Sequence, residues 1–543
     1  MINRPLFVSY GIYGAGSISL IFEAPESPIY LSIFSLAGEC FWGVPKFVSQ
    51  GAEVLKLRHI LTKTEFQDFR EQLYNEFEHR ADSKMDLLDA FCSNNHSPSV
   101  VQLSLNPLFR RGYSALFKAI EGSPSSPLSE ENTPQPEDIP LQQGDEFQFL
   151  DLIAQVVPTP KQRPFFLFGQ DCTSIERRFA QTLEDRGMVY QPTPIKGNKP
   201  ITIGHSYSLI AVLPERNDED APWTIALDMS RVPTESNSTQ IGIAQMNTVL
   251  SNPNMPWTDE LCVLVVDSAY GNHKFLTPLQ EHKNLVVVAR SRSNRVFYQR
   301  PIPSKKTPGK GHPTWYGERF DLKDNETWHE PSEVNHTAYQ TRQGRTINVT
   351  ITAWHNMLMR GSKKLPTHEY PFTILSIVSV DESGKSIFNP MWLIVMGERR
   401  SEISSVQTFQ SYRQRFDLEH TFRFQKQNLL LNAFETPDVE HEQYWIYLVM
   451  LAYVQLWAAH ALAVALPRPW ESDIKLEASA RISPSKVQQD WNRIISQLGS
   501  PAAAPKPRGI SPGRQLGHSQ TPRPRFPVVK KTKSKKTVTK MAV

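Results

Sequence analysis

The sequence of this 543-residue chain predicts an α/β fold, and three observations lead to that prediction. At roughly 150 residues per domain, the length favours three or four domains, or a core that carries insertions. Hydrophobic residues make up 39% of the chain and charged residues 21%, so most of it can bury a core. In the middle of the chain, short apolar runs alternate with helical stretches, which is typical of a sheet covered by helices.

Three segments precede that alternation. Residues 1–62 are aromatic and rich in Gly and Ser without a sustained period, so we treat them as an N-terminal extension whose fold the sequence does not predict. Residues 63–121 have the periodicity of helices. Residues 122–146 are rich in Pro, Ser and Glu, which predicts a linker or an exposed loop because such a segment cannot bury a core.

The alternating segment spans residues 147–300 and has the order three strands, a helix, a strand, a helix and a strand. The predicted strands cover residues 165–169, 201–213, 223–227, 261–266 and 285–289, and the predicted helices cover residues 239–250 and 274–282. This order makes an α/β layer rather than a helix bundle.

Three further segments complete the chain. Residues 301–400 alternate between apolar and polar side chains and predict a β-rich insertion. Residues 401–500 return to helical periodicity. Residues 501–543 contain eleven Lys or Arg residues and no acid, and they predict a disordered basic tail. The net charge of +4 therefore comes from the tail, and the rest of the chain is acidic overall.

The cysteines and the apolar runs indicate the cellular compartment in which we expect the protein. The four cysteines are widely spaced and form no cluster with His, which argues against a structural zinc site and a disulfide framework and favours a reducing cytoplasm. Residues 446–466 carry no charge and are long enough to span a bilayer. They contain Gln455 and His460 and follow two Glu residues, so we favour a buried core helix over a membrane span.

Two predicted strands are followed by acids. Asp171 comes after the strand at 165–169, and Asp267 comes directly after the strand at 261–266. Carboxylates at strand ends, joined by a third from a later helix, can hold two divalent cations that stabilise the attacking and leaving oxygens at phosphorus. Mg²⁺ suits such a site because it prefers oxygen ligands.

A third acid lies within a charged helical stripe made of Tyr412, Arg415, Glu419 and Lys426. At about 100° per residue these four side chains fall within a stripe about 60° wide on a single helix. A carboxylate beside a phenol, a guanidinium and an ammonium can combine metal binding with phosphate binding. An amphipathic helix that turns a charged face to water is the alternative, and the spacing alone does not exclude it.

The segment YRQRFDLEHTFRFQK carries a family resemblance. It has Tyr, two residues, Arg, three residues, Glu, six residues and Lys, and with the two acids it resembles the DDE transposases of bacterial insertion sequences, in the branch marked by the Tyr–Arg–Glu–Lys signature. The resemblance covers about residues 162–466. It implies an RNase H-like catalytic core in two parts, residues 147–300 and 401–500, interrupted by the β-rich insertion at 301–400.

The resemblance also implies residue roles and partners. The catalytic, metal-holding acids would be Asp171, Asp267 and Glu419. The groups that grip transposon-end phosphates would be Tyr412, Arg415 and Lys426. The implied cofactor is Mg²⁺, as two ions that Mn²⁺ can replace. The implied partners are double-stranded DNA, as terminal inverted repeats and target DNA, and a second copy of the chain on synapsed ends, in the bacterial cytoplasm at the nucleoid and without a membrane.

Asp228 is an alternative to Asp171 as the first acid, because it also ends a predicted strand. Only one helix separates Asp228 from the strand before Asp267. The first core strand must instead be followed by two more strands before that helix, so we favour Asp171.

Several other features can be interpreted either as DNA-binding groups or as ordinary surface and core residues. Residues 290–310 contain seven cations and no acid, which favours a DNA track over a solvated loop. The cations proposed for this track are Arg290, Arg292, Arg295, Arg300, Lys305 and Lys306. The helical region at 63–121 resembles a transposon-end binding region, although its sequence shows no helix-turn-helix signature. Trp354 and Trp392 are core residues in our interpretation rather than base-stacking groups.

These features predict a Mg²⁺-dependent endonuclease and strand transferase that moves an insertion sequence by a cut-and-paste route. The alternative is a domesticated, catalytically inactive DNA-binding protein derived from a transposase. The intact acids and the complete signature favour the enzyme.

Overall fold

The computed structural model describes residues 61–120, 149–191, 200–218, 220–301, 315–341, 343–362, 364–465, 482–507, 516–517, 519 and 521–530, together with three strands between residues 10 and 32. The chain divides into two compact units, Met1–Leu57 and Arg58–Val543. In the first unit an antiparallel sheet is formed in sequence order by β1 (Tyr10–Tyr13), β2 (Ser17–Phe22) and β3 (Ile29–Ser32).

The second unit is built on a ten-stranded mixed sheet. The strand order is β12-β13-β14-β15-β9-β8-β4-β6-β5, and β7 pairs with β6. The strands nearest the predicted acids are β4 (Phe166–Glu176), β5 (Gly187–Tyr190), β6 (Ile201–Val212), β7 (Ile225–Val232), β8 (Cys262–Val266) and β9 (Leu285–Ser291). β8 pairs in parallel with β4 and β9, whereas β4, β6 and β7 pair antiparallel.

The order β7-β6-β4-β8-β9 is that of an RNase H-like core, so the predicted α/β fold class is confirmed. β5 is an additional strand that the sequence analysis did not predict. The predicted helix at 274–282 is two short pieces, α8 (His273–Leu276) and the 3₁₀ turn η2 (Pro278–Glu281), because Pro278 cannot continue the first helix.

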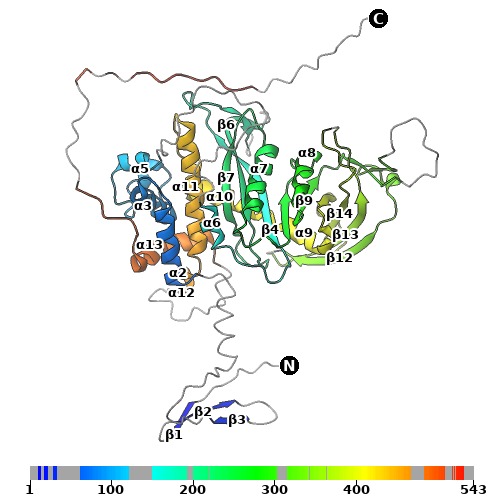
Figure 1. Cartoon of the computed structure of the whole chain (residues 1–543), viewed down its shortest axis with the longest axis horizontal. Coiled ribbons are helices and arrows are strands. Elements are labelled where there is room, and N and C mark those ends of the chain that lie inside the picture. The colour runs from blue at the N-terminus through cyan, green and yellow to red at the C-terminus, as the bar shows by residue number, and fades with distance from the viewer. Residues whose placement is uncertain are drawn as a thin grey trace. The chain divides into compact units, whose positions relative to one another are not determined.

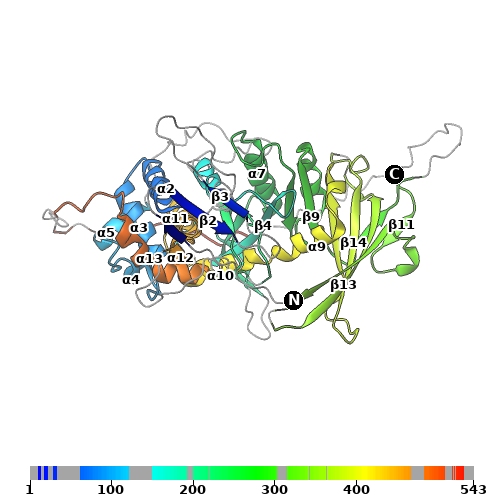
Figure 2. The same ribbon diagram turned by 90° about the horizontal axis from the view of Figure 1, so that it is seen from below.

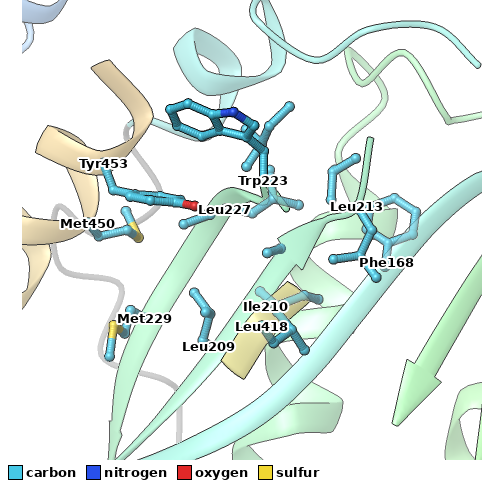
Figure 3. Close-up of a cluster of buried hydrophobic side chains, with 14 of the residues drawn as sticks. Phe168, Leu209, Ile210, Leu213, Trp223, Leu227, Met229, Leu418, Met450 and Tyr453 are labelled. Carbon is cyan, nitrogen blue, oxygen red and sulfur yellow. The ribbon is translucent and has the colours of Figure 1, made fainter. Parts of the chain in front are cut away.

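Helices cover both faces of the core sheet (Figure 1). On β6, Ser208 donates to Gln245 of α7 (Ser238–Ser251), and the next residue toward the N-terminus, Tyr207, donates to Glu442 of α11 (Val439–Ala458). Since successive strand residues point to opposite faces, α7 and α11 lie on opposite sides of the sheet. α10 (Asp417–Asn428) lies on the α11 side, where Leu418 joins Leu209, Met450 and Tyr453 in the core (Figure 3).

The β-rich insertion extends the core sheet. Its first strands are β10 (Val296–Tyr298), which begins before the predicted start of the insertion at residue 301, and β11 (Arg319–Asp321), and the two pair with each other. The others are β12 (Glu333–Gln340), β13 (Thr346–Met357), β14 (Phe372–Val380) and β15 (Met391–Met396). β15 pairs antiparallel with β9, so the insertion and the core share one sheet. Trp354 and Trp392 are both 3% exposed with ring centroids 5.8 Å apart, as expected of core residues.

The helical region before the core packs on α11. It comprises α2 (Lys63–Asn75), α3 (Ala81–Cys92), α4 (Val100–Leu103) and α5 (Tyr113–Ala119), and α6 (Leu150–Ala154) follows residues 121–148. Arg70 of α2 is 2% exposed and donates to Asp89 of α3 at 2.7 Å and to Gln455 of α11 at 2.9 Å. This buried network joins the region to α11 and so to the large sheet. The predicted linker at 122–146 lies outside the described residues.

The C-terminal part departs from the predicted disordered tail. After α12 (Leu462–Ala465) and α13 (Pro484–Leu498), the backbone N–H of Ala503 donates to Asp82 at 2.8 Å. Further on, the N–H groups of Phe526 and Val529 donate to the carbonyls of Gln181 and Arg186. Disorder is therefore a wrong prediction for these two stretches, because backbone hydrogen bonds fix them to the body. Residues 531–543 lie outside the described part of the chain.

The apolar stretch at 446–466 corresponds mostly to α11, which begins earlier, at Val439, and ends at Ala458. Among the described residues, no helix has the length and apolar character needed to cross a membrane. Instead, α11 is buried along nearly its whole length against β7 and α3.

A buried ion network fixes α11 to the sheet. Glu442 is fully buried and accepts from Arg177 at 2.5 Å, from His205 at 2.7 Å and from Tyr207 at 2.8 Å. Burial on its own raises a carboxyl pKa, but the hydrogen bond from His205 and the charge of Arg177 lower the pKa of Glu442 to about 2. Arg177 also donates to the carbonyls of Asn432 and Phe434, in the turn that joins α10 to α11.

We predict that Glu442→Gln destabilises the protein by about 3–5 kcal/mol, because it leaves Arg177 buried without its counter-charge. Urea unfolding at pH 7 measures this loss. Because the folded pKa is depressed, the contribution of Glu442 is complete above about pH 4.5 and is lost as the pH falls through about 2. Glu440→Gln, on the same helix but exposed, is the control and should change stability by less than about 0.5 kcal/mol. Equal effects of the two changes would contradict this account.

Candidate active site

Sheet register brings two of the predicted acids together. The last parallel pairs are Gln170 with Val266 and Val266 with Ala289. The residues that follow these pairs are Asp171 on β4, Asp267 directly after β8, and Arg290 on β9. Their side chains therefore stand in one row across the three strands. The expectation that Asp171 ends its strand is wrong, because β4 continues to Glu176 through its antiparallel pairing with β6. Parallel pairing with β8 ends at this level.

The face of β4 that carries Asp171 is the face on which α10 packs. Gly169, two residues earlier, points to the same face, and a Cβ there would lie 3.0 Å from Leu418. This close approach brings Glu419, the next residue, over the strand. Asp417 fixes the start of α10 through a two-pronged ion pair with Arg216, with both N–O distances 2.7 Å.

Arg415 joins the acids across these elements. Its Nη1 donates to Asp171 Oδ2 at 2.7 Å, and its Nη2 lies 3.4 Å from Glu419 Oε1. The exposed fraction is 13% for the Arg415 side chain, 21% for Asp171 and 42% for Glu419. The three side chains therefore form a partly buried cluster that opens to solvent at Glu419.

The helix that carries the signature is not continuous. α9 (Ser405–Gln414) contains Tyr412, Arg415 is its C-cap, and Glu419 and Lys426 lie on α10. Between the helices the backbone forms i→i+3 hydrogen bonds, from Arg415 to Tyr412 and from Glu419 to Phe416, which is a short 3₁₀ stretch. Because Arg415 and Phe416 keep right-handed helical angles, α9 and α10 still run end to end across the sheet (Figure 2).

Burial and charge shift the ionisation of these groups. Burial raises the pKa of the Asp171 carboxyl, the charge of Arg415 opposes this, and the charge of Asp267 adds to it, giving a pKa of about 6. Burial also raises the pKa of the Tyr412 phenol, while the charges of Arg415 and Arg290 lower it. Two acids and two cations thus lie within electrostatic range of one another at this edge of the sheet.

Two signature side chains differ in how they are held. Lys426 donates to the backbone carbonyl of Ser174 on β4 at 2.9 Å, and burial lowers its pKa. The Tyr412 hydroxyl is buried beside Arg415, whose charge and side-chain hydrogen bond lower the pKa of the phenol, and the Tyr412 ring lies 5.8 Å from the Arg415 guanidinium carbon. A buried hydroxyl beside two arginines is a group to which an incoming phosphate oxygen could bind.

The predicted basic track is only partly described. Arg290 is exposed on β9 beside Asp267, and Arg292 is exposed just beyond it. Arg295 donates to the carbonyl of Gly271, in the turn that follows Asp267. Burial lowers the pKa of Arg400, and the charge of Arg300 lowers it further, so these two cations are close. Lys305 and Lys306 lie outside the described residues.

Asp228 lies elsewhere. It is on β7, fully buried, and accepts from Ser230 at 2.6 Å and from Gln245 of α7 at 2.5 Å. Burial raises the pKa of the Asp228 carboxyl, and the hydrogen bonds from Ser230 and Gln245 oppose this. Asp171 faces α10, whereas Asp228 faces α7 on the other side of the sheet.

Two groups at this edge were not among the residues predicted from the sequence. Arg400 follows β15 in the segment GERR, which could have been noticed as a paired cation after a strand. Tyr270 lies 3.3 Å from the Cys172 sulfur and is 1% exposed, so it packs behind the acids. Its place in the segment DSAYGN gave no signal of that contact.

The donor chemistry at the row fits a divalent cation that prefers oxygen. Asp171 and Asp267 are adjacent carboxylates, and the effect of Asp267 on the pKa of Asp171 is the repulsion that a shared cation relieves. Glu419 is held by Arg415 instead. Across the described residues, no three or more His, Cys, Asp and Glu side chains are grouped so as to hold a metal ion.

A family model described as DDE superfamily endonuclease matches residues 72–361, which is just over half of the chain. The chain belongs to this family of endonucleases. No curated protein matches it. The match includes Asp171 and Asp267 and ends before α9, so the signature residues and Glu419 lie beyond it. Membership supports a transposase-like nuclease with DNA as its substrate, in a superfamily that generally uses divalent metal ions.

The turn after Asp267 depends on Gly271. A Cβ at this position would lie 2.4 Å from the Arg290 carbonyl oxygen, which is backbone and cannot turn aside. We predict that Gly271→Ala in this endonuclease destabilises the protein by about 1–3 kcal/mol by pushing the turn away from β9. Thermal unfolding measures the change. Ala269→Ser, at an exposed position of the same turn, should leave the melting temperature unchanged, and an unaltered melting temperature for Gly271→Ala would refute the contact.

Proposed function

We propose that this endonuclease is a Mg²⁺-dependent DNA transposase of the Tyr–Arg–Glu–Lys branch that moves a bacterial insertion sequence by a cut-and-paste route. The observation that carries the proposal is the row of Asp171 and Asp267 on adjacent parallel strands, with Arg415 linking Asp171 to Glu419. Family membership supports the reaction class.

In this proposal Asp171, Asp267 and Glu419 are the catalytic residues and hold the metal. Two bound Mg²⁺ or Mn²⁺ ions would stabilise the oxygens that attack and leave phosphorus. β8 is fully buried and β4 is buried up to Gln170, so Asp171 and Asp267 directly follow well-packed stretches of strand. Glu419 is more exposed than Asp171 and would be accessible to a DNA strand. No protein nucleophile is required, because water cleaves the end and the freed 3′-hydroxyl then attacks target DNA.

The Tyr412 phenol and the cations around this row would bind the phosphates on either side of the cut. We assign this role to Tyr412, Arg415, Lys426, Arg290, Arg292, Arg295, Arg300, Lys305 and Lys306. Arg290 is the best supported of the track, because it stands next to Asp267 and its charge acts on Tyr412. Phosphate neutralisation by such cations gives affinity without sequence reading, so recognition of the terminal repeats needs another surface. We assign that recognition to the helical region at 63–121.

Cut-and-paste movement needs two ends held together, so the proposed active form is a dimer on synapsed terminal repeats. The proposed location is the bacterial cytoplasm, at the nucleoid, where the target DNA lies. The alternative is a domesticated protein that binds DNA without cutting it. The three acids and the complete signature favour the enzyme, because binding alone does not use the acids.

The test uses labelled duplex DNA that carries the terminal repeats flanking the gene. Wild-type protein should cut at the repeat boundary with Mg²⁺ and not with EDTA. Asp171→Asn, Asp267→Asn and Glu419→Gln should each lower the cleavage rate by roughly 10³-fold or more, since each removes several kcal/mol of transition-state stabilisation. All three should still bind the duplex in a gel-shift assay.

Asp228→Asn is the matched control. Asp228 faces α7 on the other side of the sheet, and an amide oxygen can accept the same hydrogen bonds from Ser230 and Gln245, so the variant should cut at the wild-type rate. Cleavage retained by Glu419→Gln would refute the assignment of the site. Duplex binding without cleavage by wild-type protein would favour the domesticated alternative.

A further inference from the structure

Arg415 is unusual among the cations at the active site because it faces acids. Its guanidinium donates to the carboxylates of Asp171 and Glu419, and it also lies beside the Tyr412 phenol. Lys426, by contrast, is bonded to a backbone carbonyl on β4. Arg415 therefore supplies positive charge to two of the three acids that are assigned to the metal.

Arg415 lies at the junction between two helices. It is the C-cap of α9, at the short 3₁₀ stretch before α10, and the adjacent Phe416 side chain is 51% exposed. Such tightened segments within a helix often mark hinges. The buried Tyr412 hydroxyl is next to the guanidinium and offers Arg415 a further polar neighbour.

We propose that Arg415 is an internal counter-cation that competes with divalent metal for Asp171 and Glu419, and that a DNA phosphate draws it away from them. This inference rests on the proposed function and adds a coupling to it. In the absence of DNA the acids are neutralised by Arg415 and hold metal weakly. When a phosphate of the DNA strand binds the guanidinium, the two carboxylates become available to metal.

A coupling of this kind is reciprocal. If DNA strengthens metal binding by releasing Arg415, then metal must strengthen DNA binding by the same factor. This coupling would keep the metal site incomplete until a DNA strand is bound. An opposite charge within contact distance changes a carboxylate's proton affinity by 1–3 pKa units, so a metal-affinity change of about tenfold or more is expected from its removal.

Isothermal titration of the full-length protein with MnCl₂ tests the proposal. Without DNA, Arg415→Gln should bind Mn²⁺ about tenfold more tightly than wild type. A repeat-end duplex should tighten Mn²⁺ binding to wild type by a similar factor, and it should have little effect on Arg415→Gln. The control is Arg413→Gln, since Arg413 is two residues away, pairs with exposed Asp218 and lies over the Tyr339 ring. This control should bind Mn²⁺ as wild type does.

Equal or weaker Mn²⁺ binding by Arg415→Gln without DNA would overturn the proposal. If that variant does not fold, as judged by its thermal transition, Arg415→Lys replaces it. The shorter Lys keeps the charge without the forked contact and should give an affinity between those of wild type and the wild-type complex with DNA. Unchanged affinity for a folded Arg415→Lys variant, with no effect of DNA on wild type, would likewise overturn the proposal.

The titration and the cleavage assay can fail separately. Tighter Mn²⁺ binding by Arg415→Gln in a protein that never cuts DNA would support the counter-cation and refute the enzyme. Normal cleavage with no change in Mn²⁺ affinity would support the enzyme and refute the counter-cation.

Discussion

The parallel pairing of β8 with β4 and β9 is the constraint on which the candidate active site depends. The register of these strands places Asp171, Asp267 and Arg290 in one row, although they come from three separate parts of the chain. A shift of one residue would turn one of these side chains to the opposite face. β8 consists of five fully buried apolar residues, and this burial holds the register.

Charge interactions also shape the candidate active site. The pKa of Asp171 is raised mainly by its burial and further by repulsion from the neighbouring carboxylate of Asp267. Arg415 offsets part of the repulsion from the helical side. The third acid, Glu419, is brought to the sheet by the close contact of Leu418 with Gly169 and by the Asp417–Arg216 pair. The buried network at Glu442 then fixes the neighbouring α11 to the same sheet.

Local patterns in the sequence were sufficient for the fold class and for the order of the core elements. Short apolar runs marked β4, β6, β7, β8 and β9 because such strands are buried on both faces. Patterns could not show that β15 would pair with β9, since sheet pairing over a long interval depends on tertiary packing. They also placed the end of β4 too early, because its polar second half is stabilised by β6 rather than by apolar burial.

The candidate site was predictable to the same extent. The acids and the signature residues could be named from the apolar runs and the sequence motif, although Asp171 does not end its strand and the signature spans two helices. The contact of Arg415 with Asp171 could not, because it joins residues 244 apart in sequence. The ordered stretch near Phe526 was likewise unpredictable, since its hydrogen bonds come from backbone groups that any sequence has.

Anomalous diffraction from crystals of the protein bound to a repeat-end duplex and Mn²⁺ tests the central claim most directly. The account predicts an anomalous peak between the carboxylates of Asp171 and Asp267, with the Arg415 guanidinium on a DNA phosphate. A peak at Asp228, or an Arg415 that remains on Asp171 while the row holds no metal, would contradict it.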